Sequence, residues 1–232
     1  MPITKVDTVK LKRRIILVLL VTIVMLGLFL FVPAGTLYFW QAWVYSIVFF
    51  VSSATITFYI WKNDPALLER RSEIGVVEEK EKKQKIIQGF AYIGFILILV
   101  IPALDHRFGW SNVPFFIVIL GNILVIAGLY LYFLVLKENT FASATIEITK
   151  DQKVISTGPY SLVRHPLYLG ALIMLFGTPI ARGSWWGLIV VVLYVFALVT
   201  RIRDEEKFLS KNLQGYDEYR QKVRYRLIPL LW

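Results

Sequence analysis

The stretch at residues 113–136 reads VPFFIVILGNILVIAGLYLYFLVL and contains no Asp, Glu, Lys or Arg. It is longer than the roughly 20 residues that an α-helix needs to cross the hydrocarbon core of a bilayer. Five further uncharged stretches occur along the chain, at residues 15–32, 37–61, 86–104, 167–180 and 184–200. The sequence therefore predicts an all-α, polytopic integral membrane bundle with about six membrane segments.

The fifth stretch, residues 167–180, is too short for an upright span. At 1.5 Å per residue its helix would reach about 21 Å, against a hydrocarbon core of about 30 Å. Together with residues 184–200 it predicts a tight helical hairpin that turns at Ala181, Arg182 and Gly183. We expect the shorter arm to be tilted or to lie against protein rather than lipid.

The composition supports a membrane location and excludes several kinds of site. Hydrophobic residues make up 57% of the chain and charged residues 18%, whereas soluble domains have about 45–50% and about a quarter. The chain has no cysteine and two histidines. Disulfides and Cys-ligated metals are therefore excluded, and no metal site is expected.

The basic residues are concentrated on one side of the predicted membrane. Of the 26 Lys and Arg residues, 24 lie before the first segment, in the loops 62–85 and 137–164, or in the tail from Arg201. The opposite loops hold only Arg107 and Arg182. The positive-inside rule then predicts cytoplasmic N- and C-termini. Because topology alone explains the net charge of +10, no nucleic-acid partner is expected.

The uncharged spans also limit the function. Transporters, proton pumps and voltage sensors usually place ionisable residues at membrane depth, and these spans contain no Asp, Glu, Lys or Arg. Any chemistry is therefore expected at the cytoplasmic membrane surface, in the loops and the tail.

The first cytoplasmic loop, residues 62–85, is predicted to contain an amphipathic helix. Asp64 is a suitable N-cap, and Pro65 is suited to the first helical position. Glu78 with Lys82, and two further Glu–Lys pairs, follow at i,i+4 spacing. This segment could be a solvated helix leading into the third span, or a cover over an active site.

The second cytoplasmic loop ends in STGPYSLVRHPLYLG at residues 156–170. Gly158-Pro159 signals a turn, and Pro166 is placed as the first residue of the short fifth helix. His165 should therefore lie near a helix N-terminus, where free N–H groups and the helix dipole favour an anionic group.

The tail begins with RIRDEEKFL at residues 201–209. If the sixth helix continues, Arg201 and Glu205 lie one turn apart on a shared face. They could form a solvated ion pair at a helix end or belong to a site. The predicted hairpin brings them to the same end as His165, which favours a site.

These two clusters together form an ordered sequence pattern. The motif RHPLYLG at residues 164–170 is followed by residues 201–209 and by Gly215-Tyr216, Tyr219 and Val223. This order resembles the isoprenylcysteine carboxyl methyltransferase and phospholipid methyltransferase family of integral membrane enzymes. The resemblance is greatest to its bacterial branch, as LDHRFGWS at residues 104–111 also suggests, and this implies a bacterial inner membrane.

The resemblance implies a catalytic region at 137–232, preceded by N-terminal membrane helices at 1–136. It also implies an S-adenosylmethionine site at the cytoplasmic face and a lipophilic or lipid-modified acceptor. Arg201 corresponds to the arginine associated with an acceptor carboxylate. The implied cofactor-binding residues are Gln152, Lys153, Val154, Ile155, Tyr160, His165, Pro166, Leu167, Tyr168, Glu205 and the adjacent Glu206. Gln152 departs from the histidine of the eukaryotic carboxyl methyltransferases.

The chemistry of these residues agrees with such a cofactor. Carboxylates of the Glu-Glu pair can accept hydrogen bonds from hydroxyl or amino groups, and Tyr160, Tyr168 and Phe208 offer flat apolar surfaces. Two other functions remain open. One is a membrane sterol-type reductase with a nicotinamide donor, and the other is a non-catalytic lipid-binding protein, which would leave the ordered polar clusters unexplained.

Overall fold

A computed structural model describes residues 8–72, 82–142 and 152–232. The described residues form helices, one 3-10 turn and connecting loops, and contain no strand. The elements are α1 (Thr8–Ala34), α2 (Trp40–Asn63), α3 (Pro65–Ser72), α4 (Lys82–Phe108), α5 (Phe115–Glu138), the turn η1 (Gly158–Ser161), α6 (Pro166–Ala181), α7 (Trp186–Asn212) and α8 (Tyr216–Lys222). The predicted all-α fold is confirmed.

Five of the helices are long and apolar enough to cross a membrane: α1, α2, α4, α5 and α7. The remaining apolar helix, α6, has 16 residues and is therefore about 24 Å long. It forms the predicted hairpin with α7, and the turn follows Ala181 with Gly183 at φ +73°. The chain is thus an integral membrane protein whose described residues contain five full-length apolar helices and one short one.

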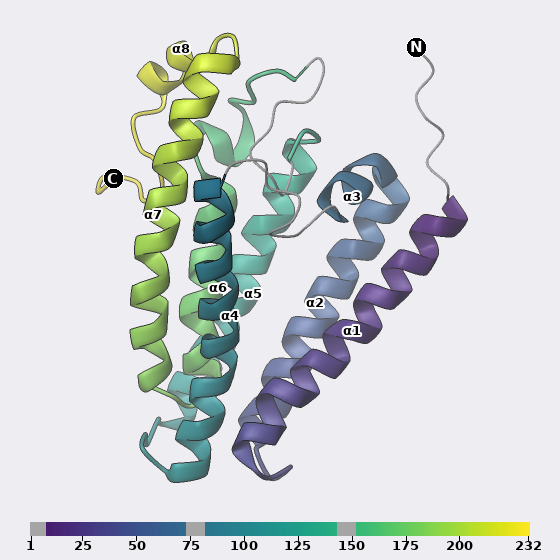
Figure 1. Cartoon of the computed structure of the whole chain (residues 1–232), viewed down its shortest axis with the longest axis vertical. Helices are drawn as coiled ribbons and strands as arrows, with labels where there is room; N and C mark the ends of the chain where they lie inside the picture. Colours follow the sequence, from purple (N-terminus) through teal and green to yellow (C-terminus); the bar gives the residue numbers. More distant parts are fainter. Residues whose placement is uncertain (1–7, 73–81, 143–151) are drawn as a thin grey trace.

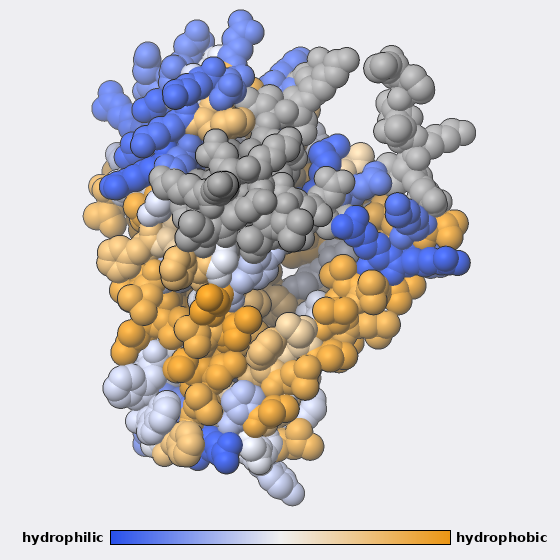
Figure 2. Space-filling view, in the orientation of Figure 1, coloured by the Kyte–Doolittle hydropathy of each residue, from blue (hydrophilic) through white to orange (hydrophobic). Residues whose placement is uncertain are grey.

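The helices run alternately along one axis (Figure 1). The start of α1 and the end of α7 lie toward the same end of the molecule, and α1 and α2 lean away from the other helices at that end. Figure 2 shows a broad hydrophobic belt around the middle, with hydrophilic side chains gathered at the end that carries α8. This distribution matches a bundle that crosses a bilayer and exposes its polar loops at that end.

Glycines allow α5 and α6 to pack with their backbones in close contact. A Cβ on Gly121 would lie 2.3 Å from the amide nitrogen of Ala181, and one on Gly128 would lie 2.5 Å from the carbonyl oxygen of Gly170. Gly177 faces the carbonyl of Gly121 in the same way, at 2.6 Å. Small residues at such positions let membrane helices approach closely. The start of α6 is therefore fixed relative to the end of α5.

Arg182 replaces a backbone hydrogen bond that is missing in α4. Pro102 lies inside α4 and has no N–H, so the carbonyl of Ile98 lacks its usual helical partner. The Arg182 side chain donates hydrogen bonds to this carbonyl and, at 2.8 Å, to that of Leu99. The sequence places Arg182 in a turn outside the membrane segments, where an arginine would be expected to be exposed. Only 1% of its surface is exposed.

Helix α3 begins as the sequence predicts. The amide of Leu67 donates a hydrogen bond to Asp64 Oδ1 at 2.9 Å, and Pro65 is the first helical residue. Leu67 is 1% exposed and packs in a cluster with Ile60 and Leu136. The segment is therefore docked on α2 and α5 rather than simply solvated. The predicted Glu–Lys pairs involve residues 78, 79 and 81, which lie outside the described ranges.

Candidate active site

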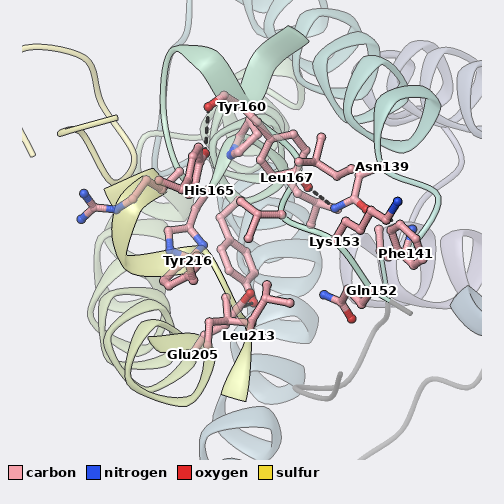
Figure 3. A pocket seen from close by; sticks show the side chains of 18 residues that line it. Asn139, Phe141, Gln152, Lys153, Tyr160, His165, Leu167, Glu205, Leu213 and Tyr216 are labelled. Carbon is pink, nitrogen blue, oxygen red and sulfur yellow. Dashed lines mark hydrogen bonds between the residues drawn. The ribbon is translucent and has the colours of Figure 1, made fainter. Parts of the chain in front are cut away.

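A pocket lies at the polar end of the bundle, between the ends of α5 and α7, the start of α6, and α8 (Figure 3). The predicted cofactor-binding residues that line it are Gln152, Lys153, Val154, Ile155, Tyr160, His165, Pro166, Leu167, Tyr168 and Glu205. Glu206 does not line the pocket, and neither does Arg201, the predicted catalytic residue. The fold thus brings two sequence segments about 40 residues apart into one enclosure.

Several lining residues were not predicted as site residues. Those that belong to the recognised motifs are Arg164, Leu209, Tyr216 and Tyr219, and the others are Asn139, Phe141, Ala142 and Leu213. Asn139 is the C-cap residue of α5, and its side-chain oxygen accepts a hydrogen bond from the amide of Phe141 at 3.0 Å, a local role that is common for asparagine in turns. The sequence therefore offers no signal that distinguishes it as a site residue.

The start of α6 is held by the C-terminal segment. Pro166 is the first helical residue, and His165 is the N-cap residue with φ −122°. The amide of Arg164 donates to the carbonyl of Tyr225, and that of His165 donates to Arg226, both at 2.9 Å. These two backbone bonds fix His165 in the pocket wall.

Glu206 is the centre of a buried ion cluster next to the pocket. Its Oε1 accepts a hydrogen bond from Arg164 Nε at 2.6 Å, and its Oε2 accepts one from Arg226 Nε at 2.8 Å. His165 Nε2 lies 3.4 Å from the same carboxylate. Arg164 also donates to the carbonyls of Val223 and Arg224, each at 3.0 Å. Glu206 thereby ties α7, the loop before α6 and the tail together.

Arg201 and Glu205 are connected through Tyr168. The hydroxyl of Tyr168 donates a hydrogen bond to Glu205 Oε2 at 2.6 Å, and Arg201 Nε donates to that hydroxyl at 3.0 Å. The two charged residues occupy one face of α7, as the sequence predicts, and the tyrosine on α6 joins them. Interpreting them as an isolated, solvated ion pair does not account for these bonds.

Tyr160 contributes a neutral aromatic surface to the pocket. Asn139 Nδ2 donates to its hydroxyl oxygen at 2.8 Å, and Tyr219 donates to its carbonyl at 2.8 Å. Burial disfavours the phenolate and raises the pKa of Tyr160 to about 12. Burial also raises the pKa values of Tyr216 and Tyr219. All three tyrosines are therefore uncharged at neutral pH.

The Tyr216 hydroxyl has an unsatisfied position in this wall. It is buried and has no hydrogen-bond partner among the residues that the structure describes. Buried polar groups in proteins are nearly always hydrogen-bonded. This hydroxyl is therefore available to a polar ligand. Across the described ranges, no group of three or more His, Cys, Asp or Glu side chains is arranged to hold a metal ion.

A second, largely apolar cavity of about 600 Å³ lies among the membrane helices. Its size is within the usual range of ligand pockets. It is lined by side chains of α2 to α7, mainly Phe49, Ile56, Ala91, Tyr92, Phe95, Leu129, Tyr132, Ala171, Met174 and Tyr194. Tyr132 packs in the same cluster as Leu167, which lines the polar pocket. The two spaces are therefore neighbours.

The fold and these two spaces define a membrane-embedded helical protein with a polar pocket beside an apolar cavity. Residues 116–215 match the family model of phospholipid methyltransferases. The predicted resemblance to the isoprenylcysteine and phospholipid methyltransferase family is thereby confirmed for this segment. The match starts within α5, upstream of the predicted catalytic region.

Curated relatives also match part of the chain. The chain is 31% identical over 121 residues to a protein-S-isoprenylcysteine O-methyltransferase of Saccharomyces cerevisiae, covering 50% of this chain and 51% of that one. A Schizosaccharomyces pombe protein of the same name is 33% identical over 76 residues, 32% of each chain. The mouse Delta(14)-sterol reductase TM7SF2 is 35% identical over 91 residues, which are 38% of this chain and 22% of the reductase. The chain therefore spans about half or less of these relatives.

Proposed function

We propose that this protein is an S-adenosylmethionine-dependent methyltransferase that acts on a lipophilic acceptor in the membrane. The observation that carries the proposal is a polar, tyrosine-rich pocket, lined mostly by the segment that matches the methyltransferase family, which lies beside an apolar cavity. A soluble cofactor could reach the first space from water, and an acceptor with a hydrocarbon chain could reach the second from lipid.

The residues of the polar pocket fit the cofactor's chemistry. S-adenosylmethionine supplies an electrophilic methyl group on a sulfonium, and it also carries an adenine, ribose hydroxyls and a zwitterionic end. Glu205 can accept hydrogen bonds from its hydroxyl or amino groups, and the Tyr216 hydroxyl can satisfy its own missing bond there. Val154, Ile155 and Tyr160 offer apolar surface to the adenine. His165, which lines the same pocket, is the proposed partner of the amino-acid end.

The acceptor is assigned to the apolar cavity, with its reacting group directed toward the polar pocket. If the reacting group is a carboxylate, it is already ionised and needs no strong general base. What the protein must then supply is orientation, exclusion of water and a counter-charge. Arg201 is the proposed counter-charge, because its guanidinium can make two parallel contacts to a carboxylate.

The orientation follows from the charge distribution. We place both termini and the polar pocket on the cytoplasmic side, since 24 of the 26 basic residues flank that face. The resemblance to the bacterial branch of the family supports a bacterial inner membrane. Reporter fusions test the arrangement. A reporter at the C-terminus should be active only in the cytoplasm, and activity on the outer side would contradict it.

A sterol-type reductase is the second candidate, because the mouse reductase matches over 91 residues. Calorimetry on the purified full chain separates the two functions. Binding of S-adenosylmethionine without binding of NADPH is expected. Binding of NADPH alone would overturn the methyltransferase proposal, and binding of neither would favour a lipid-binding protein.

Single variants test the cofactor assignment. His165→Ala and Glu205→Ala each remove a polar group from a partly desolvated pocket, which should cost about 1–3 kcal/mol, or about tenfold or more in S-adenosylmethionine affinity. Glu218→Ala on α8 is a suitable control, because Glu218 is exposed and does not line the pocket. Equal affinities in all three variants would remove the site assignment.

A further inference from the structure

Helix α3 places a cation in the wall of the apolar cavity. Leu67 anchors the helix in the cluster with α2 and α5, with 1% of its surface exposed. Arg71 follows one turn later, and residues four apart on a helix lie on the same face. Arg71 consequently lines the cavity, and it is the one charged side chain among the described residues that do so.

Arg71 is held in this position by Tyr132. Its Nη2 donates a hydrogen bond to the Tyr132 hydroxyl at 2.5 Å, and the guanidinium carbon lies 5.5 Å from the ring centroid. Arginine remains charged in any protein environment. A guanidinium fixed beside an apolar space is suited to the anionic group of an amphiphile whose chain fills that space.

The location of Arg71 also relates it to the polar pocket. Its partner Tyr132 packs in the cluster that contains Leu167, a lining residue of that pocket. Burial raises the pKa of Tyr160, and the charge of Arg71 is near enough to oppose that rise. An anion bound at Arg71 would therefore lie on the side of the apolar cavity that faces the cofactor.

The preceding residue, Arg70, has a different environment. Its guanidinium donates to the backbone carbonyl of Thr140 at 2.5 Å, and it lines neither the cavity nor the polar pocket. Two adjacent arginines on one short helix thus differ in what they contact. This difference provides a control with the same charge and nearly the same position.

We propose that Arg71 is a specificity-determining residue that selects acceptors with an anionic head group on a hydrocarbon chain. This inference rests on the proposed function, because it treats the apolar cavity as the acceptor site. It assigns recognition of the head group to α3, in addition to the role proposed for Arg201 on α7. Helix α3 then belongs to the acceptor site.

The test compares hexadecanoate with hexadecanol, which share a chain and differ in head-group charge. Binding of each is measured on the detergent-solubilised full chain at about pH 8, where the carboxylate is ionised. The wild-type protein should bind hexadecanoate about tenfold more tightly, as expected for a charge-assisted contact. Arg71→Gln should remove most of this preference and leave hexadecanol affinity nearly unchanged, whereas Arg70→Gln should retain the preference.

A further variant keeps the proposal decidable. Arg71→Lys retains the charge but loses the planar contact, so the preference should fall several-fold while the fold is kept. A full preference in Arg71→Gln or Arg71→Lys, or no preference in the wild type, would overturn the proposal.

Binding of S-adenosylmethionine is followed in the same preparations, so that the two hypotheses can fail separately. If the cofactor binds and no head-group preference exists, the role of Arg71 is wrong and the methyltransferase proposal stands. If the cofactor does not bind, the methyltransferase proposal is wrong, and a preference that depends on Arg71 would still identify an anion-selective lipid site.

Discussion

Glu205 and Glu206 are neighbours in the sequence, yet their carboxylates bind different partners in different places. Glu205 lines the polar pocket and accepts a hydrogen bond from Tyr168 at 2.6 Å. Glu206 lies in the buried cluster with Arg164 and Arg226, outside the pocket lining. Of the two adjacent acids, only Glu205 is therefore placed where a ligand in the pocket could contact it, and Glu206 holds the pocket wall.

Glu206→Gln should lower the free energy of unfolding by about 3 kcal/mol, because it leaves the Arg164 charge without its buried counter-ion. Glu205→Gln is the matched change one residue earlier. It should leave stability nearly unchanged and mainly weaken S-adenosylmethionine binding. Denaturation in detergent and calorimetry measure the two effects. Equal stability of the two variants would contradict this division of roles.

The elements of the fold that depend on hydropathy could be predicted from the sequence. Uncharged runs located the spans, and Asp64-Pro65 and Pro166 located the starts of α3 and α6. The helical hairpin also brought the motif segments together as expected. These features depend on local sequence patterns and on the length of an apolar helix.

Other features depend on packing between distant segments, which one sequence does not reveal. Arg182 is buried because it bonds to the carbonyl of Ile98, which lies 84 residues earlier and lacks its helical partner because of Pro102. Glu206 could not be distinguished from Glu205, because only the docked tail supplies Arg226 as a partner. The role of Tyr168 in joining Arg201 to Glu205 could not be predicted either, because Tyr168 lies on another helix.

Gly121→Ala should destabilise the protein by about 1–3 kcal/mol, because the added methyl group overlaps the backbone of Ala181 and forces α5 and α6 apart. Gly27→Ala on α1 is the control, since a Cβ there meets no atom within 4 Å. Alanine also favours the helix over glycine. Thermal unfolding should therefore show a loss only for Gly121→Ala. A similar loss for both would point to a general intolerance of glycine replacement.

Tyr160 should stay protonated well beyond the ordinary range of tyrosine. Burial raises its pKa from 10.0 to about 12, so an unfolded chain loses this proton first as the pH rises. The associated stability is present below pH 10 and is lost as the pH rises toward 12. Ultraviolet titration of the wild type minus Tyr160→Phe isolates the phenolate signal. Ionisation near pH 10 in the folded protein would contradict the prediction.

Arg201 distinguishes cofactor binding from acceptor chemistry. It lies outside the polar pocket lining and reaches that pocket through the Tyr168 hydroxyl. If it contacts an acceptor carboxylate, Arg201→Lys keeps the charge but loses the two-point contact, and Arg201→Ala loses both. Methyl transfer should then fall in both variants, more in Arg201→Ala, while S-adenosylmethionine affinity changes little.

The opposite outcome would identify a structural role for Arg201. Loss of its hydrogen bond would then free Tyr168 to move, and with it the carboxylate of Glu205 that lines the polar pocket. Cofactor affinity and turnover would decline in parallel. Tyr168→Phe provides the comparison, because it removes the hydroxyl between Arg201 and Glu205 and leaves both charges in place. If Arg201→Ala preserves cofactor affinity and Tyr168→Phe weakens it, the arginine acts on the acceptor and the tyrosine supports the cofactor.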